Sequence, residues 1–134
     1  MLEEEFSTFQ RRLPHWRLRG GVYFVTWRLT PSHAKLSLAD RDKVAGAVEF
    51  FNGKRFHLFA YVVMDDHIHV LVQPGADHSL SSILHSWKSF TAHELNKQSG
   101  RGGRVWQEDN YTRIIRDESE LQAVAEYIQG NPLK

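Results

Sequence analysis

The chain has 134 residues, of which 41% are hydrophobic and 25% charged, and a formal net charge of +1. These values are typical of one globular domain, and we expect a single domain over 1–134 with a basic N-terminal extension at 1–19. The absence of cysteine excludes disulfides, thiolate metal sites and cysteine nucleophiles. No apolar run is long enough to span a bilayer, and the acidic start does not resemble a secretory signal, so a cytoplasmic location is expected.

The first half of the chain predicts a strand, a helix and a hairpin. Aromatic and β-branched residues predict a strand over 20–29, and apolar residues at helical spacing predict a helix over 37–51. Ser37 is placed to cap this helix. Strands are predicted over 55–64 and 67–74, with only two aspartates between them, as in a tight antiparallel hairpin.

The second half predicts an amphipathic helix over 79–97, a short strand over 110–117 and a final helix over 118–131. The complete order matches an α+β fold of the ferredoxin-like (RRM-like) type, with a βαββαβ antiparallel sheet followed by a C-terminal helix. A sheet of this kind covers one face with helices and can leave the other free for ligands. Because many functions share this fold, the fold alone does not decide the chemistry.

Basic residues gather in the two segments "QRRLPHWRLRG" and "KQSGRGGRVW". Such segments are often only solvated surface, but they also fit a footprint for phosphate groups. Their arginines are Arg11, Arg12, Arg17, Arg19, Arg101 and Arg104.

Two histidines flank an isoleucine in the stretch "DDHIHVLV", residues 65–72. Because side chains alternate along a strand, His67 and His69 share one face, whereas the apolar Ile68, Val70 and Val72 share the other. Neighbours on one face lie about 7 Å apart, close enough for two imidazoles to bind one cation. Two interpretations stay open: a pair of solvated strand residues, or a metal site that takes a third ligand from elsewhere.

The final helix carries Tyr127 beside its apolar stripe and Asn131 four residues later on the same face. From spacing alone, a packing tyrosine followed by an Asn-Pro helix stop is the simpler interpretation. Tyr127 becomes a candidate functional residue if its helix lies against the strand of the two histidines.

The stretches "YVVMDDHIHVLVQP" and "VWQEDNYTRIIRDESELQAVAEYIQGNPLK" together resemble the single-tyrosine HUH transposases, and in particular the IS200-like branch of REP-associated tyrosine transposases. The resemblance covers most of residues 20–134 and is weakest over 30–55 and 96–104. It implies metal-dependent cleavage and rejoining of single-stranded DNA, on hairpin or repetitive palindromic sequences, through a 5′-phosphotyrosine intermediate. The expected partners are single-stranded or hairpin DNA of the bacterial nucleoid and no membrane, with the protein acting as a monomer or homodimer.

The same resemblance implies roles for individual residues. His67 and His69 would bind a divalent metal (Mg²⁺ or Mn²⁺), Asn131 would complete its coordination, and Tyr127 would be the nucleophile. Tyr111 competes for that role and ranks lower, because it matches a strand-side aromatic of the family. The residues expected to contact DNA are Arg11, Arg12, Arg17, Arg19, Arg101, Arg104, Trp106 and Gln107, with Trp16 and Trp27 as further stacking residues.

This chain departs from the family pattern at two points. Asp66 stands where relatives commonly have asparagine before the first histidine, and its carboxylate could either join the metal site or make the turn. The chain also ends at Lys134, where relatives usually run on. Two other functions stay open: a non-catalytic nucleic-acid-binding domain derived from a transposase, and a metal-dependent hydrolase in which water attacks instead of tyrosine.

Overall fold

The structure is a computed structural model and describes residues 20–130. Its elements follow in the order β1 (Tyr23–Arg28), α3 (Leu38–Glu49), β2 (Phe56–Val63), β3 (His67–Pro74), α4 (Leu80–Ser99), β4 (Tyr111–Ile114) and α5 (Glu118–Gly130). This order confirms the predicted α+β, ferredoxin-like arrangement with an added C-terminal helix.

The four strands form one sheet in the order β2-β3-β1-β4, and every neighbouring pair is antiparallel. The pairing of β1 with both β3 and β4 places Thr26 opposite His69 on one side and opposite Tyr111 on the other. Directly opposed residues of paired strands project from the same face of a sheet. These three residues therefore form a row across the sheet, which passes through the candidate site.

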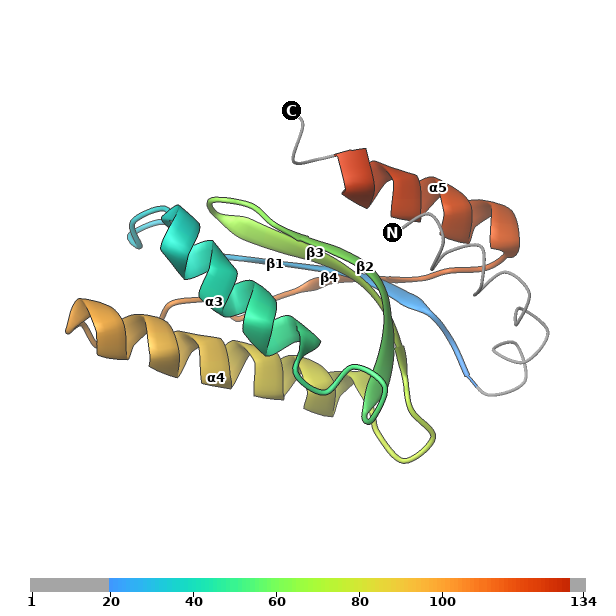
Figure 1. The fold of residues 1–134 in the computed structure, drawn as a ribbon, viewed down its shortest axis with the longest axis horizontal. Helices are drawn as coiled ribbons and strands as arrows, with labels where there is room; N and C mark the ends of the chain where they lie inside the picture. Colours follow the sequence, from blue (N-terminus) through green and yellow to red (C-terminus); the bar gives the residue numbers. More distant parts are fainter. Residues whose placement is uncertain (1–19, 131–134) are drawn as a thin grey trace.

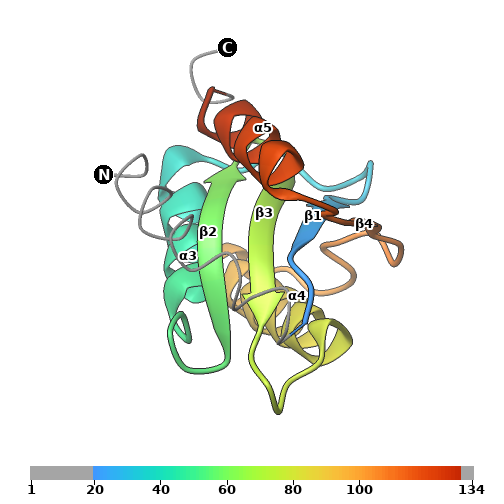
Figure 2. The same ribbon diagram turned by 90° about the vertical axis from the view of Figure 1, so that its right-hand side faces the viewer.

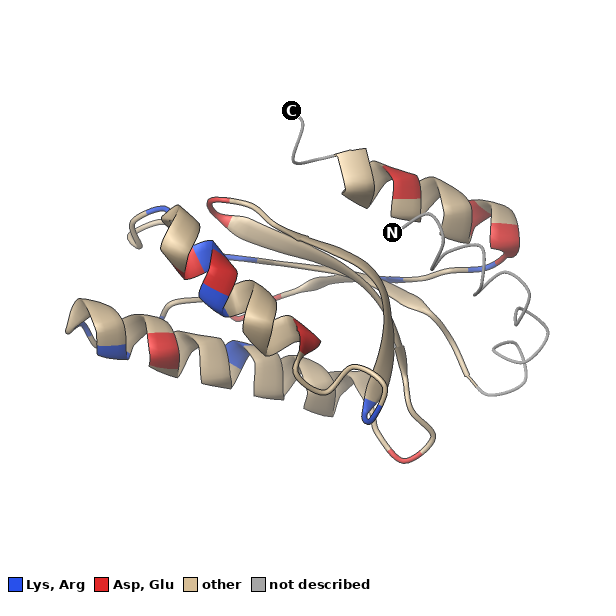
Figure 3. Cartoon of the chain, in the orientation of Figure 1, with Lys and Arg blue, Asp and Glu red and all other residues tan. Residues whose placement is uncertain are grey.

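Helices cover both faces of the sheet. In Figure 1, α3 and α4 lie below the sheet and α5 lies above it. The second face, which this fold can leave free for ligands, is covered in part here, because α5 lies across β2 and β3 (Figure 2). The charged residues of α5 are all acidic, whereas α3 and α4 carry both signs (Figure 3).

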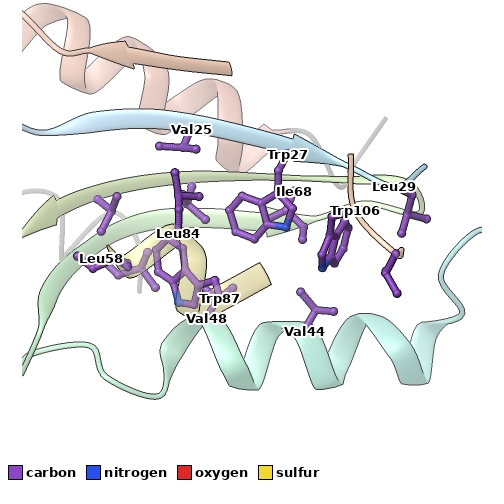
Figure 4. Packing of buried hydrophobic residues seen from close by; sticks show 14 of the residues in the cluster. Val25, Trp27, Leu29, Val44, Val48, Leu58, Ile68, Leu84, Trp87 and Trp106 are labelled. Carbon is purple, nitrogen blue, oxygen red and sulfur yellow. The ribbon is translucent and has the colours of Figure 1, made fainter. Parts of the chain in front are cut away.

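The larger core lies between the sheet and the helices α3 and α4 (Figure 4). Trp27 stacks on Trp87 with ring centroids 5.6 Å apart, and Trp106 meets Trp27 edge-on at 6.2 Å. The three residues of β3 that were predicted to face the core are buried in it: Ile68, Val70 and Val72.

A second core lies between the sheet and α5, and a β-bulge in β2 helps to build it. The pairing of β2 with β3 slips between Leu58 and Ala60. Leu58 consequently packs under the sheet with α3 and α4, whereas Phe59, Ala60 and Val62 pack in the cluster that includes α5. The bulge thus puts two consecutive residues, Phe59 and Ala60, into the core on the α5 side.

The helices α3 and α4 both begin at a serine cap. Ser37 Oγ accepts a hydrogen bond from Asp40 N–H at 3.1 Å, which confirms the predicted cap, and Ser79 Oγ accepts one from Ser82 N–H at the same distance. At its other end, α4 stops at Gly100, whose φ of 72° is a left-handed conformation that favours glycine.

Candidate active site

The two histidines lie on the α5 side of the sheet, on one face of β3 as predicted. Their ring centroids are 4.7 Å apart, with an angle of 73° between the ring planes. His69 is 6% exposed and His67 is partly buried. At this separation both imidazoles can bind the same metal ion with ordinary metal–nitrogen bond lengths.

His69 is held in place by β1. Its Nδ1 lies 2.7 Å from Thr26 Oγ1 in a buried hydrogen bond, and its ring stacks on Phe24 with centroids 5.4 Å apart. Burial, with smaller contributions from the nearby charges of His67 and Arg28, lowers the pKa of His69 to about 4. His69 is therefore neutral at pH 7, which is the form of imidazole that binds metals.

Asp66 holds the other histidine. Its Oδ1 lies 2.7 Å from His67 Nδ1, and this hydrogen bond lowers the pKa of the Asp66 carboxyl. An ionised carboxylate can only accept hydrogen bonds, so His67 Nδ1 is the donor and Nε2 is the ring nitrogen that faces away from Asp66. The backbone carbonyl of Asp66 meanwhile accepts from Leu29 N–H at 2.9 Å. Asp66 therefore acts both in the turn and on the first histidine of the pair.

Tyr127 lies beside this pair, although it comes from a distant part of the chain. Its ring centroid is 5.6 Å from that of His69 and 6.4 Å from that of Phe24. The apolar stripe of α5 is buried against the sheet, whereas Tyr127 at the edge of the stripe is 54% exposed. The helix thus lies against the histidine strand, which is the condition under which the sequence makes Tyr127 a functional candidate.

Tyr111, the competing candidate for the nucleophile, lines a cavity that Tyr127 also lines. Tyr111 stands at the end of the row of three residues across the sheet, is 55% exposed, and meets Phe24 edge-on with centroids 6.1 Å apart. A cavity of about 730 Å³ has Phe24, His69 and both tyrosines among its walls. Its other walls include Arg28, Gln107, Asp109 and Arg113.

Within residues 20–130, no group of three or more His, Cys, Asp or Glu side chains is arranged to hold a metal. A metal bound to His67 and His69 would therefore take its other ligands from residues of another type, from water or from DNA. Asn131, the predicted third ligand, lies outside the described residues.

The structure corrects the expectation that Trp106 and Trp27 contact DNA. Trp106 is 3% exposed, and its Nε1–H donates to Thr91 Oγ1 at 2.9 Å. Trp27 is completely buried in the same core. A base can stack on neither ring unless that ring leaves the core.

The remaining residues expected at the DNA have different surroundings. Gln107 N–H donates to Arg28 O at 2.8 Å and its Nε2 donates to Leu29 O at 2.9 Å, which fixes the chain beside the end of β1. Arg101 and Arg104 are exposed after α4, and their contact with DNA stays a prediction. The residues of this set that lie outside the described part of the chain are Arg11, Arg12, Trp16, Arg17 and Arg19.

Two residues near the site were missed by sequence reasoning. Thr26 is a buried polar residue within an otherwise apolar stretch, and that interruption is the signal that could have identified it. Lys88 fixes the loop that leads into β4, because its Nζ donates to Gln107 O at 2.8 Å, Glu108 O at 3.2 Å and Asn110 Oδ1 at 2.8 Å.

The sequence matches a known family over most of its length. Residues 27–131 match the family described as Transposase IS200 like. A protein of Haemophilus influenzae, provisionally named a REP-associated tyrosine transposase, is 27% identical over 137 aligned positions, which cover 87% of this chain and 72% of that protein. A second, uncharacterised protein of Haemophilus influenzae is 36% identical over 63 positions, covering 47% and 34% respectively.

Among residues 20–130, no helix has the length and apolar character needed to cross a membrane. Two solved structures share the fold of this chain. The structure of a REP-associated tyrosine transposase bound to a REP hairpin has a TM-score of 0.71 at 24% identity, over 86% of this chain and 68% of that one. A crystal structure from Deinococcus radiodurans, provisionally described as a transposase, has a TM-score of 0.59 at 20% identity, over 81% and 88%. With the family match over residues 27–131, this chain belongs to the IS200-like transposases, which are DNA-cleaving and DNA-joining enzymes.

Proposed function

We propose that this protein cleaves and rejoins single-stranded or hairpin DNA, with Tyr127 as its nucleophile and a divalent metal held by His67 and His69. The observation that carries the proposal is the position of the Tyr127 ring, 5.6 Å from that of His69. The similarity to a transposase bound to a REP hairpin supports hairpin DNA as the substrate class.

The residues present fit a divalent metal. Nδ1 of His67 is engaged by Asp66, and Nδ1 of His69 by Thr26, so Nε2 is the nitrogen of each ring that can bind an ion. Asn131 would add an amide oxygen, a donor that suits Mg²⁺ and Mn²⁺. When bound, such a metal would polarise the scissile phosphate and stabilise negative charge on its oxygens.

The tyrosine performs the covalent step. Attack of Tyr127 Oη on the phosphorus forms an oxygen–phosphorus bond and breaks the bond to the 3′ oxygen of the preceding nucleotide. The phenol gives up its proton, the departing 3′ oxygen gains one, and the products are a 5′-phosphotyrosine and a free 3′-hydroxyl. The reverse attack by a 3′-hydroxyl restores a phosphodiester without a nucleotide cofactor, so the same site both cleaves and rejoins.

The test uses a hairpin oligonucleotide with a single-stranded flank, labelled at its 3′ end and incubated with Mn²⁺ or Mg²⁺. We expect a labelled protein–DNA adduct that survives denaturing electrophoresis and disappears in Tyr127→Phe. Tyr111→Phe is the matched control, because this tyrosine is equally exposed on the same cavity, and it should keep the adduct.

Three other results would each contradict part of the proposal. Cleavage that persists in Tyr127→Phe would favour a hydrolase in which water attacks. Loss of the adduct in Tyr111→Phe alone would move the nucleophile to β4. Binding of DNA without cleavage, with either metal, would favour a non-catalytic binding domain.

A further inference from the structure

We propose that the cavity beside the histidines binds one unpaired nucleobase of the DNA strand, stacked on the ring of Tyr111. This inference rests on the proposed function for its substrate, DNA, and adds a binding site for the nucleotide next to the scissile phosphate. It assigns Tyr111 to substrate binding, whereas Tyr127 carries the chemistry.

The aromatic rings around the cavity provide a flat surface for a base. Phe24 is buried, and the ring planes of Tyr111 and Tyr127 make angles of 74° and 82° with it. An edge-on contact of this kind engages one edge or one face of the Tyr111 ring. Because more than half of Tyr111 is exposed, a ring face stays available to a planar ligand.

Tyr111 packs edge-on against Phe24 but leaves more than half of its side chain in solvent. It lies on β4, a strand of four exposed residues at the edge of the sheet. An exposed aromatic side chain there stabilises the core little. Bases stack on aromatic rings irrespective of sequence, so single-stranded DNA is a ligand that would use this surface.

The distance from the histidines suits a neighbouring nucleotide. Tyr111 and His69 flank Thr26 from opposite strands, and adjacent strands lie about 4.7–4.9 Å apart. The backbones at Tyr111 and His69 are therefore roughly 10 Å apart. A phosphate at the histidines would place the attached nucleotide over the cavity.

The charges around the cavity favour the same path for the strand. Arg28 and Arg113 are cations on the cavity wall, where Asp109 is the one carboxylate among the described lining residues; Arg113 is ion-paired with Glu120, so Arg28 is the cation that is left for a phosphate. The neighbouring helix α5 carries only acidic charges (Figure 3). Phosphates are attracted to arginine and repelled by carboxylates, so the strand would follow β1 and β4 rather than α5.

The test measures DNA affinity in EDTA, so that it does not depend on metal or cleavage. The probe is the hairpin oligonucleotide with its single-stranded flank, and the readout is fluorescence anisotropy. We expect Tyr111→Ala to weaken binding roughly 5- to 150-fold, the range for loss of one stacked base, and Tyr111→Phe to keep the wild-type affinity. Phe50→Ala is the matched control, because Phe50 is also a largely exposed aromatic (73%) but lies on the α3 side of the molecule.

A second measurement changes the DNA as well as the protein. Abasic substitution is moved along the flank, and one position should weaken binding to the wild-type protein but not to Tyr111→Ala. Equal affinities of wild type and Tyr111→Ala, or no abasic position whose effect depends on Tyr111, would overturn the inference. Failure of the proposed nucleophile is a separate result, because it is measured by adducts of Tyr127→Phe and leaves these affinities unchanged.

Discussion

Replacement of Thr26 by valine tests whether the hydrogen bond from β1 holds the ring of His69 in place. Valine has nearly the same shape, so the change removes the 2.7 Å hydrogen bond to His69 Nδ1 and leaves a ring nitrogen unpaired in a buried layer. An unsatisfied buried polar atom costs about 1–3 kcal/mol. We expect a loss of about 2 kcal/mol in the free energy of unfolding, or roughly 6–10 °C in Tm for a chain of this length.

The same variant should bind metal more weakly. Residues that orient a metal-binding histidine typically change the affinity about 10- to 100-fold, so isothermal titration with Mn²⁺ should show a decrease of this size. Thr112→Val, the same change at an exposed position of β4, should affect neither quantity. If Thr26→Val unfolds at the wild-type urea concentration and binds Mn²⁺ with unchanged affinity, the hydrogen bond does not position the ring.

Three further predictions concern the surroundings of the site. Asp66→Asn keeps an acceptor for the first histidine but removes the charge, so Mn²⁺ affinity by titration should fall about tenfold. The control is Asp65→Asn, at a neighbouring carboxylate that pairs with Lys35 instead of a histidine, and it should keep the affinity. Glu120→Gln should lower the free energy of unfolding at pH 7 by about 0.5–1 kcal/mol. Because hydrogen bonding to the backbone lowers the folded pKa of this carboxyl below its ordinary 4.5, its contribution is present above that value and lost as pH falls, so urea curves of the two proteins should converge in acid. Lys88→Met removes the three hydrogen bonds to residues 107–110, and hydrogen exchange of that loop should accelerate; unchanged exchange would show that the loop is held otherwise.

The alternation and periodicity of the sequence predicted much of this arrangement. Alternation along β3 placed both histidines on one face, and the apolar stripe of α5 placed Tyr127 at the edge of its helix. These features depend on residues close together in the chain. The contact between α5 and the histidine strand is not local, and only the resemblance to a known family pointed to it.

Features that depend on strand register could not be predicted. Thr26 contacts His69 because β1 and β3 pair in one particular register, which a single sequence does not specify. Trp106 lies in an irregular segment that is typical of a surface loop. It is buried because it forms an isolated bridge with Leu29 at the end of β1, so its ring lies beneath the sheet.

The packing of α5 on β2 has a consequence for the order of events in the proposed reaction. Because Phe59, Ala60 and Val62 of this strand pack in one cluster with the apolar stripe of α5, detaching α5 would expose them to water. The tyrosine is therefore already docked beside the histidines before DNA arrives. If Tyr127 is the nucleophile, as proposed, the entropy lost in bringing it to its target is incurred once, during folding, and not at every encounter with a substrate.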